Sequence, residues 1–229
     1  MSVAQNSDAR RSRSFAPPVL SRSPAVTSVY GRNVSNLAHV SDVLRLRAVT
    51  THGGVYMDSD VLPLRNLFTH LSSVPFALGV QAAGATANAV VVARPHAPFA
   101  YRWADEYHSF DGADWDGHSV KLPFSLALRH PDEVLWLPNS AFFVPSWNEH
   151  PETSFSLNIT ASEWAGQPAR MALHLWHQVN PSLDAVADAA WFGAHACTLY
   201  GRLVLSIAAE HPGGRVADAL GEHAGARCE

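Results

Sequence analysis

The sequence predicts an α/β fold in which buried strands are covered by helices. Short apolar runs, which are typical of buried strands, recur at residues 55–57, 75–80, 89–93 and 134–138. Segments of helical periodicity lie between them at residues 41–52, 98–110 and 122–129. Strands that alternate with helices along a chain favour a sheet covered by helices.

The composition is that of one globular domain and gives no case for nucleic acid or a membrane span. The chain has 229 residues, 47% of them hydrophobic and 16% charged, and its formal net charge is −4. A chain of this length buries roughly 70% of its extended surface on folding. The negative charge does not attract nucleic acid, and no apolar run is long enough for a transmembrane helix. The two cysteines, Cys197 and Cys228, predict neither a disulfide framework nor a metal site.

Composition divides the chain into three segments. Residues 1–32 are rich in Ser, Arg, Pro and Ala without periodicity, which predicts a disordered arm, and the arm lacks the apolar stretch of a signal peptide. Residues 33–209 are expected to form the folded domain. Residues 210–229 are rich in Gly and Ala and predict a frayed tail. Glycosylation sequons at Asn33 and Asn158 mildly favour a lumenal location.

The helix predicted at residues 41–52 carries two charged side chains on one side. Ser41 is expected to cap it, and Gly53 is expected to end it. Asp42 and Arg45 are one turn apart and therefore neighbours. They are either a surface ion pair or a pair that reaches the site at the end of the next strand.

Two carboxylates follow the first predicted strand, which runs through Val55, Tyr56 and Met57. Side chains alternate along a strand, so Asp58 and Asp60 are expected to point to the same side. Two acids this close repel each other unless a cation lies between them. Mg²⁺ and Mn²⁺ accept such oxygen ligands and leave positions for water and phosphate, so the pattern predicts a metal–diphosphate site.

Two loops carry further candidates whose interpretation stays open. The small-residue loop at residues 81–88 resembles a hairpin or a crossover with room for a ligand, and Asn88 at its end is either a turn residue or a ligand contact. The Gly/Asp loop at residues 111–118 contains Trp115 and His118. Trp115 is either a packing anchor or a platform for the apolar face of a sugar.

The apolar run at residues 171–177 predicts a late strand with a histidine in it. Leu173 and Leu175 are expected to face the core, with His174 and Trp176 on the other side. A histidine in such a run is more often a hydrogen-bonded core residue than a metal ligand, and spacing alone does not separate these roles.

The helix, Gly-Gly turn and acidic pair together resemble a known family. Ser41-Asp42-Val43-Leu44-Arg45-Leu46 followed by residues 52–61 resembles the DXD sugar-binding region of glycosyltransferase family 32, which includes α-1,4-galactosyltransferases and yeast-type α-mannosyltransferases. Asn88-Ala89-Val90, Trp115-Asp116-Gly117-His118 and Leu173-His174-Leu175-Trp176 resemble later elements of its galactosyltransferase branch. Ser119-Val120 departs from the Gln-Gly of that branch.

The resemblance implies a GT-A fold, in which a Rossmann-like mixed sheet is flanked by helices, and a retaining, metal-dependent glycosyltransferase. A hexose, such as galactose or mannose, would pass from a UDP- or GDP-sugar to a glycan or glycolipid hydroxyl, with Mn²⁺ or Mg²⁺, and family members of this kind work in the Golgi lumen. The family's first nucleotide-binding strand lies well upstream of the Ser-Asp helix. Only about forty residues precede Asp42 and none of them predicts that strand, so we expect it to be missing and the chain to be N-terminally truncated.

The resemblance also implies roles for individual residues. Asp58, Asp60 and His174 would hold the metal ion. Asp42, Arg45 and Asp60 would act at the reacting sugar. The remaining donor contacts, together with Asp58, would be Gly54, Tyr56, Asn88, His118 and Trp176.

Two other functions remain open. The first is a catalytically inactive relative or fragment that binds a sugar or a nucleotide. The second is a Mg²⁺-dependent phosphatase of the haloacid-dehalogenase type, with Asp58 as nucleophile and Asp60 as acid/base. Such a phosphatase needs a lysine to hold phosphate, and Lys121 is the only lysine in the chain.

Overall fold

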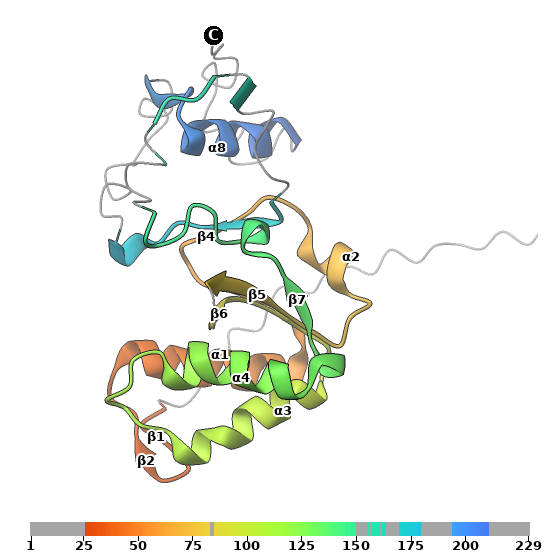
Figure 1. Ribbon diagram of the computed structural model, residues 1–229, viewed down its shortest axis with the longest axis vertical. Coiled ribbons are helices and arrows are strands. Elements are labelled where there is room, and N and C mark those ends of the chain that lie inside the picture. The colour runs from red at the N-terminus through yellow and green to blue at the C-terminus, as the bar shows by residue number, and fades with distance from the viewer. Residues whose placement is uncertain are drawn as a thin grey trace, which may run out of the picture.

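The computed structural model describes residues 26–82, 85–149, 155, 157–160, 162–163, 170–179 and 194–210 (Figure 1). Most of the expected arm, nearly all of the expected tail and residues 180–193 of the expected domain lie outside the described residues. The helices are α1 (Leu37–His52), α2 (Leu67–Leu71), α3 (Pro98–Asp105), α4 (Leu122–Arg129) and α8 (Leu199–Glu210). Shorter helical turns are η1 (Glu106–Ser109), η2 (Gly117–Lys121), η3 (Pro131–Glu133), η4 (Asn139–Ala141) and η5 (His177–Val179).

A four-stranded mixed sheet forms the centre of the molecule. Its strands are β3 (Gly54–Met57), β6 (Ala85–Ala93), β5 (Phe76–Ala82) and β7 (Leu135–Leu137), in that order. Strand β6 pairs antiparallel with both neighbours, and only β5 and β7 are parallel. A mixed sheet flanked by helices agrees with the predicted α/β class and is consistent with a GT-A-like fold. Among the described residues, no strand pairs with the second edge of β3.

Helices cover one face of the sheet, and a second small sheet lies beyond the other. In Figure 1, α1, α3 and α4 lie on one side, whereas β4 (Val61–Pro63) and α8 lie on the opposite side. Strand β4 pairs antiparallel with β8 (Ala172–His174). The hairpin of β1 (Ser28–Val29) and β2 (Arg32–Asn33) precedes α1.

Side-chain alternation along the central strands produces two cores. Phe76 and Leu78 of β5 and Val91 of β6 pack against α1, α3 and α4. Val90 and Val92, one residue out of phase, pack against α2 and the aromatic segment after η4. Because β-strand side chains alternate between faces, a strand buried on both faces is apolar throughout, which is the pattern that predicted β5 and β6.

Helix α1 begins four residues earlier than expected. The Asn36 side chain accepts a hydrogen bond from the Ala38 N–H and caps the helix, so Ser41 is an interior residue and not the cap. The predicted end is confirmed, because Gly53 takes a positive φ of 62° and its N–H bonds to Val49 O.

Two segment boundaries also differ from expectation. Val26 and Val29 are buried in the core with α1, so the packed domain begins before residue 33. Strand β5 extends to Ala82 and β6 begins at Ala85, so most of the expected 81–88 segment belongs to these two strands and Asn88 lies inside β6. Thr86 is 2% exposed and its hydroxyl donates to Val120 O, so η2 covers and stabilises this end of β6.

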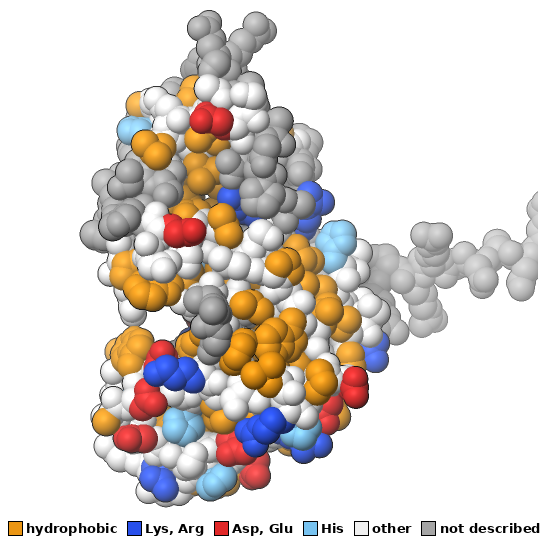
Figure 2. Space-filling model, in the orientation of Figure 1, with side chains coloured by type: hydrophobic (Ala, Val, Ile, Leu, Met, Phe, Trp, Pro, Cys, Tyr) orange, Lys and Arg blue, Asp and Glu red, His pale blue; other side chains and the backbone are white. Residues whose placement is uncertain are grey.

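The surface seen in Figure 2 is mixed in character, with hydrophobic side chains gathered over α4. Leu128 of α4 and Leu135 at the start of β7 are among the exposed large hydrophobic residues. No helix of the described residues is long and apolar enough to cross a membrane. Cys197 is disulfide-bonded, which the sequence did not predict.

The two glycines between α1 and β3 differ in the space around them, which gives a matched test of this turn. A Cβ on Gly53 would lie 2.5 Å from Pro95 Cδ, whereas a Cβ on Gly54 would meet nothing within 4 Å. Both glycines have positive φ, so each alanine carries backbone strain of about 1–2 kcal/mol. Gly53→Ala should lower the free energy of unfolding by about 1–3 kcal/mol more than Gly54→Ala, measured by urea denaturation. Equal losses would contradict the close packing of this turn on Pro95.

Candidate functional site

The acidic pair lies in a tight turn between β3 and β4. Strand β3 ends at Met57, and the Val61 N–H donates to Asp58 O across the turn at 3.1 Å. The Asp58 N–H donates to Ala89 O of β6 at 2.8 Å, which fixes the start of the turn to the central sheet. The two acids therefore converge because of the turn, and not because of the strand alternation that the sequence suggested.

The β4–β8 pairing brings a histidine to this turn. In that register His174 lies opposite Val61, and the Leu175 N–H donates to Asp60 O at 2.8 Å. Asp58, Asp60 and His174 each offer one ligand atom, and these atoms all lie within 4.8 Å of one another. The central sheet and the β4–β8 pair thus hold residues 58, 60 and 174 together, although residue 174 is far from the other two in sequence.

This group fits a divalent cation. Ligands around an octahedral Mg²⁺ or Mn²⁺ ion lie roughly 3 to 4.3 Å apart, since each is about 2.1 Å from the metal. Asp58, Asp60 and His174 need only a small contraction to reach those separations. Two carboxylates and one imidazole also match the oxygen and nitrogen ligands that these metals accept.

His174 holds Asp60 in its ionised form. His174 Nε2 lies 3.2 Å from Asp60 Oδ2, and the His177 N–H donates to the same oxygen at 3.0 Å. Burial raises the pKa of Asp60, but the hydrogen bonds and charge of these partners outweigh it and lower the pKa to about 2. A carboxylate that is ionised at every physiological pH is suited to bind a cation.

Trp176 packs on the histidine and completes its surroundings. The two ring centroids are 4.0 Å apart, and the Trp176 Nε1–H donates to Pro145 O at 2.8 Å. Trp176 has a positive φ of 55°, an unusual conformation that directs the chain away from β8. His174 Nδ1 is buried and has no hydrogen-bond partner in the described residues. Trp176 therefore packs against His174, in addition to the donor contact that the family resemblance implies for it.

Arg45 reaches from α1 to Asp58 with both of its terminal nitrogens. Its Nη1 lies 3.2 Å from Asp58 Oδ2 and its Nη2 lies 3.1 Å from Asp58 Oδ1. Nη1 also donates to Asn88 O and Nη2 to Ser41 Oγ. The guanidinium is 4.7 Å from the centre of the Tyr56 ring. This bidentate contact fixes both the guanidinium of Arg45 and the carboxylate of Asp58. Because Arg45 is 7% exposed, its charge is little screened by water.

Asp42 lies behind Arg45 in a nearly closed environment. It is 8% exposed, its Oδ1 accepts a hydrogen bond from Asn88 Nδ2 at 2.7 Å, and the same oxygen is 3.4 Å from Arg45 Nη2. Burial raises the pKa of Asp42 although Arg45 and Asn88 act in the opposite direction. The surface ion pair that the sequence left open is therefore excluded, because Asp42 and Arg45 both lie inside the site.

Tyr56 and Ser41 complete the wall beside Arg45. The Tyr56 hydroxyl donates to Asp58 Oδ1 at 2.6 Å and lies 3.4 Å from Ser41 Oγ. Burial and the hydrogen bond to Asp58 raise the pKa of Tyr56. A pocket of about 410 Å³ opens at this wall. Its lining combines these polar groups with the apolar side of α1: Leu37, Val40, Ser41, Leu44, Arg45, Ala48 and Tyr56.

Two predicted donor contacts lie elsewhere. Gly54 is at the start of β3, opposite Ala93 and at the far end of the strand from the acidic pair. His118 packs between Tyr107 and Phe110, with ring centroids 5.4 Å from each, and its Nε2 contacts Ser109 Oγ. Burial lowers the pKa of His118. Neither residue contacts Asp58, Asp60 or Arg45 among the described interactions.

Sequence reasoning missed two members of the site. Ser41 is predicted only as a cap, although its four-residue spacing from Arg45 already places the two on one helical face. His39, three residues before Asp42, has its Nδ1 3.8 Å from Asp42 Oδ2 and is 4% exposed. The three-residue spacing between His39 and Asp42 on one helix could have indicated that they are neighbours.

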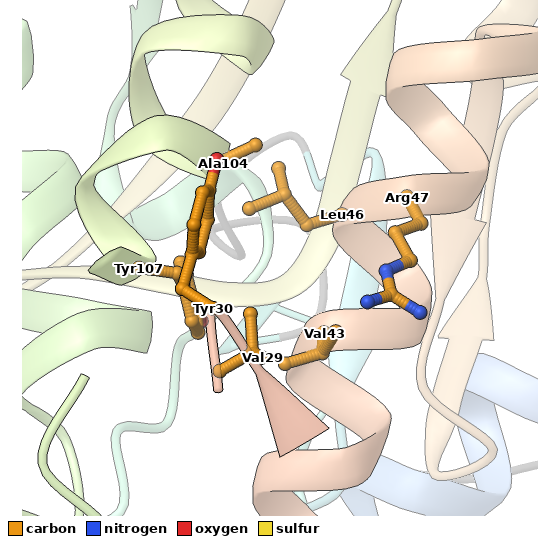
Figure 3. A pocket seen from close by; sticks show the side chains of 7 residues that line it. All are labelled: Val29, Tyr30, Val43, Leu46, Arg47, Ala104 and Tyr107. Atoms are coloured by element: carbon orange, nitrogen blue, oxygen red, sulfur yellow. The ribbon is translucent and has the colours of Figure 1, made fainter. Parts of the chain in front are cut away.

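A second pocket lies on the opposite side of α1 and is separate from the acidic pair. It has a volume of about 290 Å³ between the β1–β2 hairpin, α1 and α3 (Figure 3). Figure 3 shows mainly apolar side chains directed into it, with Arg47 at one side. No carboxylate lines it, so this pocket is not a candidate for a metal–diphosphate.

The Asp60–His174 contact predicts an acid-sensitive contribution to stability. The folded pKa of about 2 lies below the unfolded value of about 3.9, so this stability is fully present above roughly pH 5 and is lost as the pH falls towards 2. The expected loss is on the order of 2 kcal/mol. Without metal, the free energy of unfolding of Asp60→Asn should fall less steeply than that of the unmodified protein over this range. Parallel curves would contradict the assignment.

Comparison with known proteins places the site in a family context. Residues 8–77 match the family described as "Glycosyltransferase sugar-binding region containing DXD motif". The chain is 38% identical over 131 residues to "Glucan organizing enzyme 1" of Cryptococcus neoformans var. grubii serotype A (strain H99). This match covers 53% of the chain and 36% of the relative, so the chain spans only about a third of that protein. No solved structure matches the chain.

The matched segment contains the parts from which the site is built. It includes α1 with Asp42 and Arg45, strand β3, and both acids of the turn. The residues that give the family its name are therefore the residues that the structure brings together with Arg45 and His174. Residues 8–77 are therefore similar to the DXD-containing sugar-binding region of glycosyltransferases.

Proposed function

We propose that the chain transfers a hexose from a nucleotide diphosphate sugar to a hydroxyl of a glycan or glycolipid, with Mn²⁺ or Mg²⁺ and with retention of configuration. The convergence of Asp58, Asp60 and His174 within 4.8 Å carries the proposal. The name of the fungal relative refers to glucan, so a neutral glucan is the first acceptor to test. UDP and GDP are the two nucleotides to compare.

The acidic pair would bind the diphosphate through the metal ion. A divalent ion bound there supplies Lewis-acid stabilisation of the charge that develops on the leaving phosphate. Asp58 and Asp60 would be its ligands. His174 would either be the third ligand or hold Asp60 in place through the contact at 3.2 Å, as histidines and carboxylates around metal sites commonly do.

Arg45 would place a fixed positive charge beside the breaking bond. Its guanidinium is held by Asp58, Ser41 and the Asn88 carbonyl, so it needs no rearrangement when the charge develops. Preorganised charge of this kind commonly lowers the barrier of an enzymatic reaction more than any other single effect. Asp42 and Asn88, hydrogen-bonded to each other behind it, would contact the hydroxyls of the donor sugar.

The pocket of about 410 Å³ at Ser41, Arg45 and Tyr56 offers a place for the nucleoside of the donor. Arg45 and Tyr56 of this pocket each contact Asp58, so a ligand there would be within reach of a diphosphate at the acidic pair. Its apolar wall from α1 and the Tyr56 ring suit a planar base. This placement supports nucleotide binding without a strand on the second edge of β3.

Two surface features support a secretory-lumen location for the proposed enzyme. Cys197 is disulfide-bonded, and disulfides persist mainly in oxidising compartments. Asn33 and Asn158, the two sequon asparagines, are both exposed and therefore open to glycosylation. Detection of an N-linked glycan on either residue would support this location.

The phosphatase alternative receives no support from the site. Lys121 is 60% exposed at its side chain and pairs with Asp116 at 2.6 Å, so it does not reach Asp58. Strand β3, which leads to the acids, pairs antiparallel with β6. An inactive binding protein remains the second candidate, and nucleotide binding without turnover would distinguish it.

Metal-dependent nucleotide binding should require both acids of the turn. Calorimetric titration of UDP and GDP with Mn²⁺ should show binding of one nucleotide that is lost without metal. Asp58→Asn and Asp60→Asn should each weaken this binding at least tenfold, because each removes a charged metal ligand; each also loses an ion pair that stabilises the fold, so binding is measured well below the thermal transition of each variant.

Asp132→Asn is the matched control for that titration, because Asp132 is an exposed acid on η3 and lies outside the site. It should bind nucleotide as the unmodified protein does. Equal binding with and without Mn²⁺, or unchanged binding in both acid variants, would contradict the proposed metal site.

Arg45→Lys should lower the rate of sugar transfer by roughly 10²-fold, because one ammonium cannot reproduce the paired contact with Asp58. Arg47→Lys is the control: it changes the same residue type on the same helix, but at an exposed position facing the other pocket. The measurement is the initial rate of nucleotide release from the donor sugar. Similar rates for the two variants would remove Arg45 from the mechanism.

A further inference from the structure

Trp115 is exposed on a loop that is held in place. Its side chain is 55% exposed, which excludes the buried packing anchor that the sequence left open. The Ala113 N–H donates to Asp111 Oδ1 at 2.9 Å, and the Gly117 N–H donates to Asp114 Oδ1 at 3.1 Å. These hydrogen bonds fix the backbone on both sides of the tryptophan. The loop therefore presents a large aromatic face to solvent in a defined orientation.

The same loop is tied to the protein at its far end. Lys121 Nζ lies 2.6 Å from an Asp116 carboxylate oxygen, and the Trp103 Nε1–H donates to His118 O at 2.7 Å. Trp103 is 1% exposed, so this second contact anchors the loop to the core of α3. An exposed aromatic side chain on an anchored loop has little conformational entropy to lose when a ligand stacks on it.

Trp115 is connected to the donor side of the site through His39. The Trp115 and His39 ring centroids are 5.7 Å apart, and His39 Nδ1 is 3.8 Å from Asp42 Oδ2. Asp42 is in turn bound to Asn88 and next to Arg45. The side chains thus form a continuous series from the acidic pair, through the groups assigned to the donor sugar, to an exposed aromatic ring.

We propose that Trp115 is the stacking platform of an acceptor subsite, which binds the apolar face of a neutral pyranose ring, with the buried His39 packed behind the indole. The inference rests on the proposed transferase function, because it assigns the acceptor to the side of Asp42 that faces away from the acidic pair. The C–H face of a pyranose packs on indole as other apolar groups do, while its hydroxyls remain free for hydrogen bonds.

Charge around the platform selects against anionic acceptors. Asp111, Asp114 and Asp116 surround Trp115 in sequence, and Lys121 is the one cation that pairs with them among the described residues. A uronate or phosphate group beside these carboxylates would be repelled, whereas neutral hydroxyls would donate hydrogen bonds to them. The predicted ligand is therefore a neutral glycan.

The nucleotide base is the competing ligand for an exposed tryptophan. The pocket at Ser41 and Tyr56 already offers the base a site on the other side of Arg45. Trp115 lies beyond Asp42, on the side of His39. If the base did stack on Trp115, loss of the indole would weaken nucleotide binding, and this outcome would overturn the proposal.

The test compares Trp115→Ala, Trp115→Phe and Tyr101→Ala in the full chain. Tyr101 is the matched control, because it is an exposed aromatic residue (50%) that stacks on His96 near the C-terminal end of α1, away from Asp42. The probes are cellotetraose as a neutral gluco-oligosaccharide, tetragalacturonate as its anionic counterpart, and UDP or GDP with Mn²⁺. Affinities are measured by calorimetry and by saturation-transfer NMR, which also detects weak sugar binding.

We expect the unmodified protein to bind cellotetraose and to reject tetragalacturonate. Trp115→Ala should weaken cellotetraose binding at least tenfold, Trp115→Phe should restore most of it, and Tyr101→Ala should not change it. Metal-dependent nucleotide affinity should be the same in all four proteins. In a transfer assay, Trp115→Ala should raise the acceptor KM with little change in hydrolysis of the donor.

The contrary outcomes separate the two proposals. Unchanged sugar binding in Trp115→Ala, or no binding of cellotetraose by a protein that binds nucleotide and metal, overturns the acceptor subsite alone. Preference for tetragalacturonate overturns the neutral-glycan assignment. Absence of metal-dependent nucleotide binding in the unmodified protein overturns the proposed function, whatever the result with the sugar.

Discussion

Mutual repulsion of carboxylates at one end of the sheet is the constraint on which the site depends. Asp58 and Asp60 lie in one tight turn, and Asp42 faces the same region from α1. Each acid has its own partner: Arg45 for Asp58, His174 for Asp60, and Asn88 together with Arg45 for Asp42. Without these partners, three acids this close would not remain ionised together. The arrangement leaves two of them available to a divalent ion.

The fold supplies those partners from separate elements. Helix α1 lies on one face of the central sheet and brings Arg45 to the end of β3, while β8 pairs with β4 beyond the other face and brings His174. The acidic turn connects β3 to β4, so it is clamped from both sides. A site built in this way needs little rearrangement on binding, which is the condition for effective electrostatic catalysis.

The sequence predicted the elements better than it predicted the contacts. The strands around residues 78 and 91 are predictable because strands buried on both faces are apolar throughout, and Gly53 is predictable because helix ends favour glycine. The acids are recognisable from their spacing, although the turn that makes them converge is not. Pairing of β4 with β8 joins residues more than a hundred positions apart, and no local pattern reports such a register.

The errors have physical causes of the same kind. Ser41 resembles a cap when the helix start is judged from its apolar face, whereas Asn36 upstream provides the cap. Motif resemblance places His118 at the donor, whereas in the structure its ring contacts Tyr107, Phe110 and Ser109 and not the acidic pair. The small side chains of residues 81–88 suit a connecting segment, yet β5 extends to Ala82 and β6 begins at Ala85, where Thr86 is hydrogen-bonded to η2. In each case a tertiary contact overrides the local preference.

The central claim is that the turn containing Asp58 and Asp60 is a divalent-metal site. Its most direct test is X-ray diffraction from crystals grown with MnCl₂ and the bound nucleotide, recorded at a wavelength where manganese scatters anomalously. The account predicts one strong anomalous peak about 2.1–2.2 Å from carboxylate oxygens of Asp58 and Asp60, beside His174 and in contact with the diphosphate. A nucleotide bound without such a peak, or a peak coordinated by other residues, would contradict it.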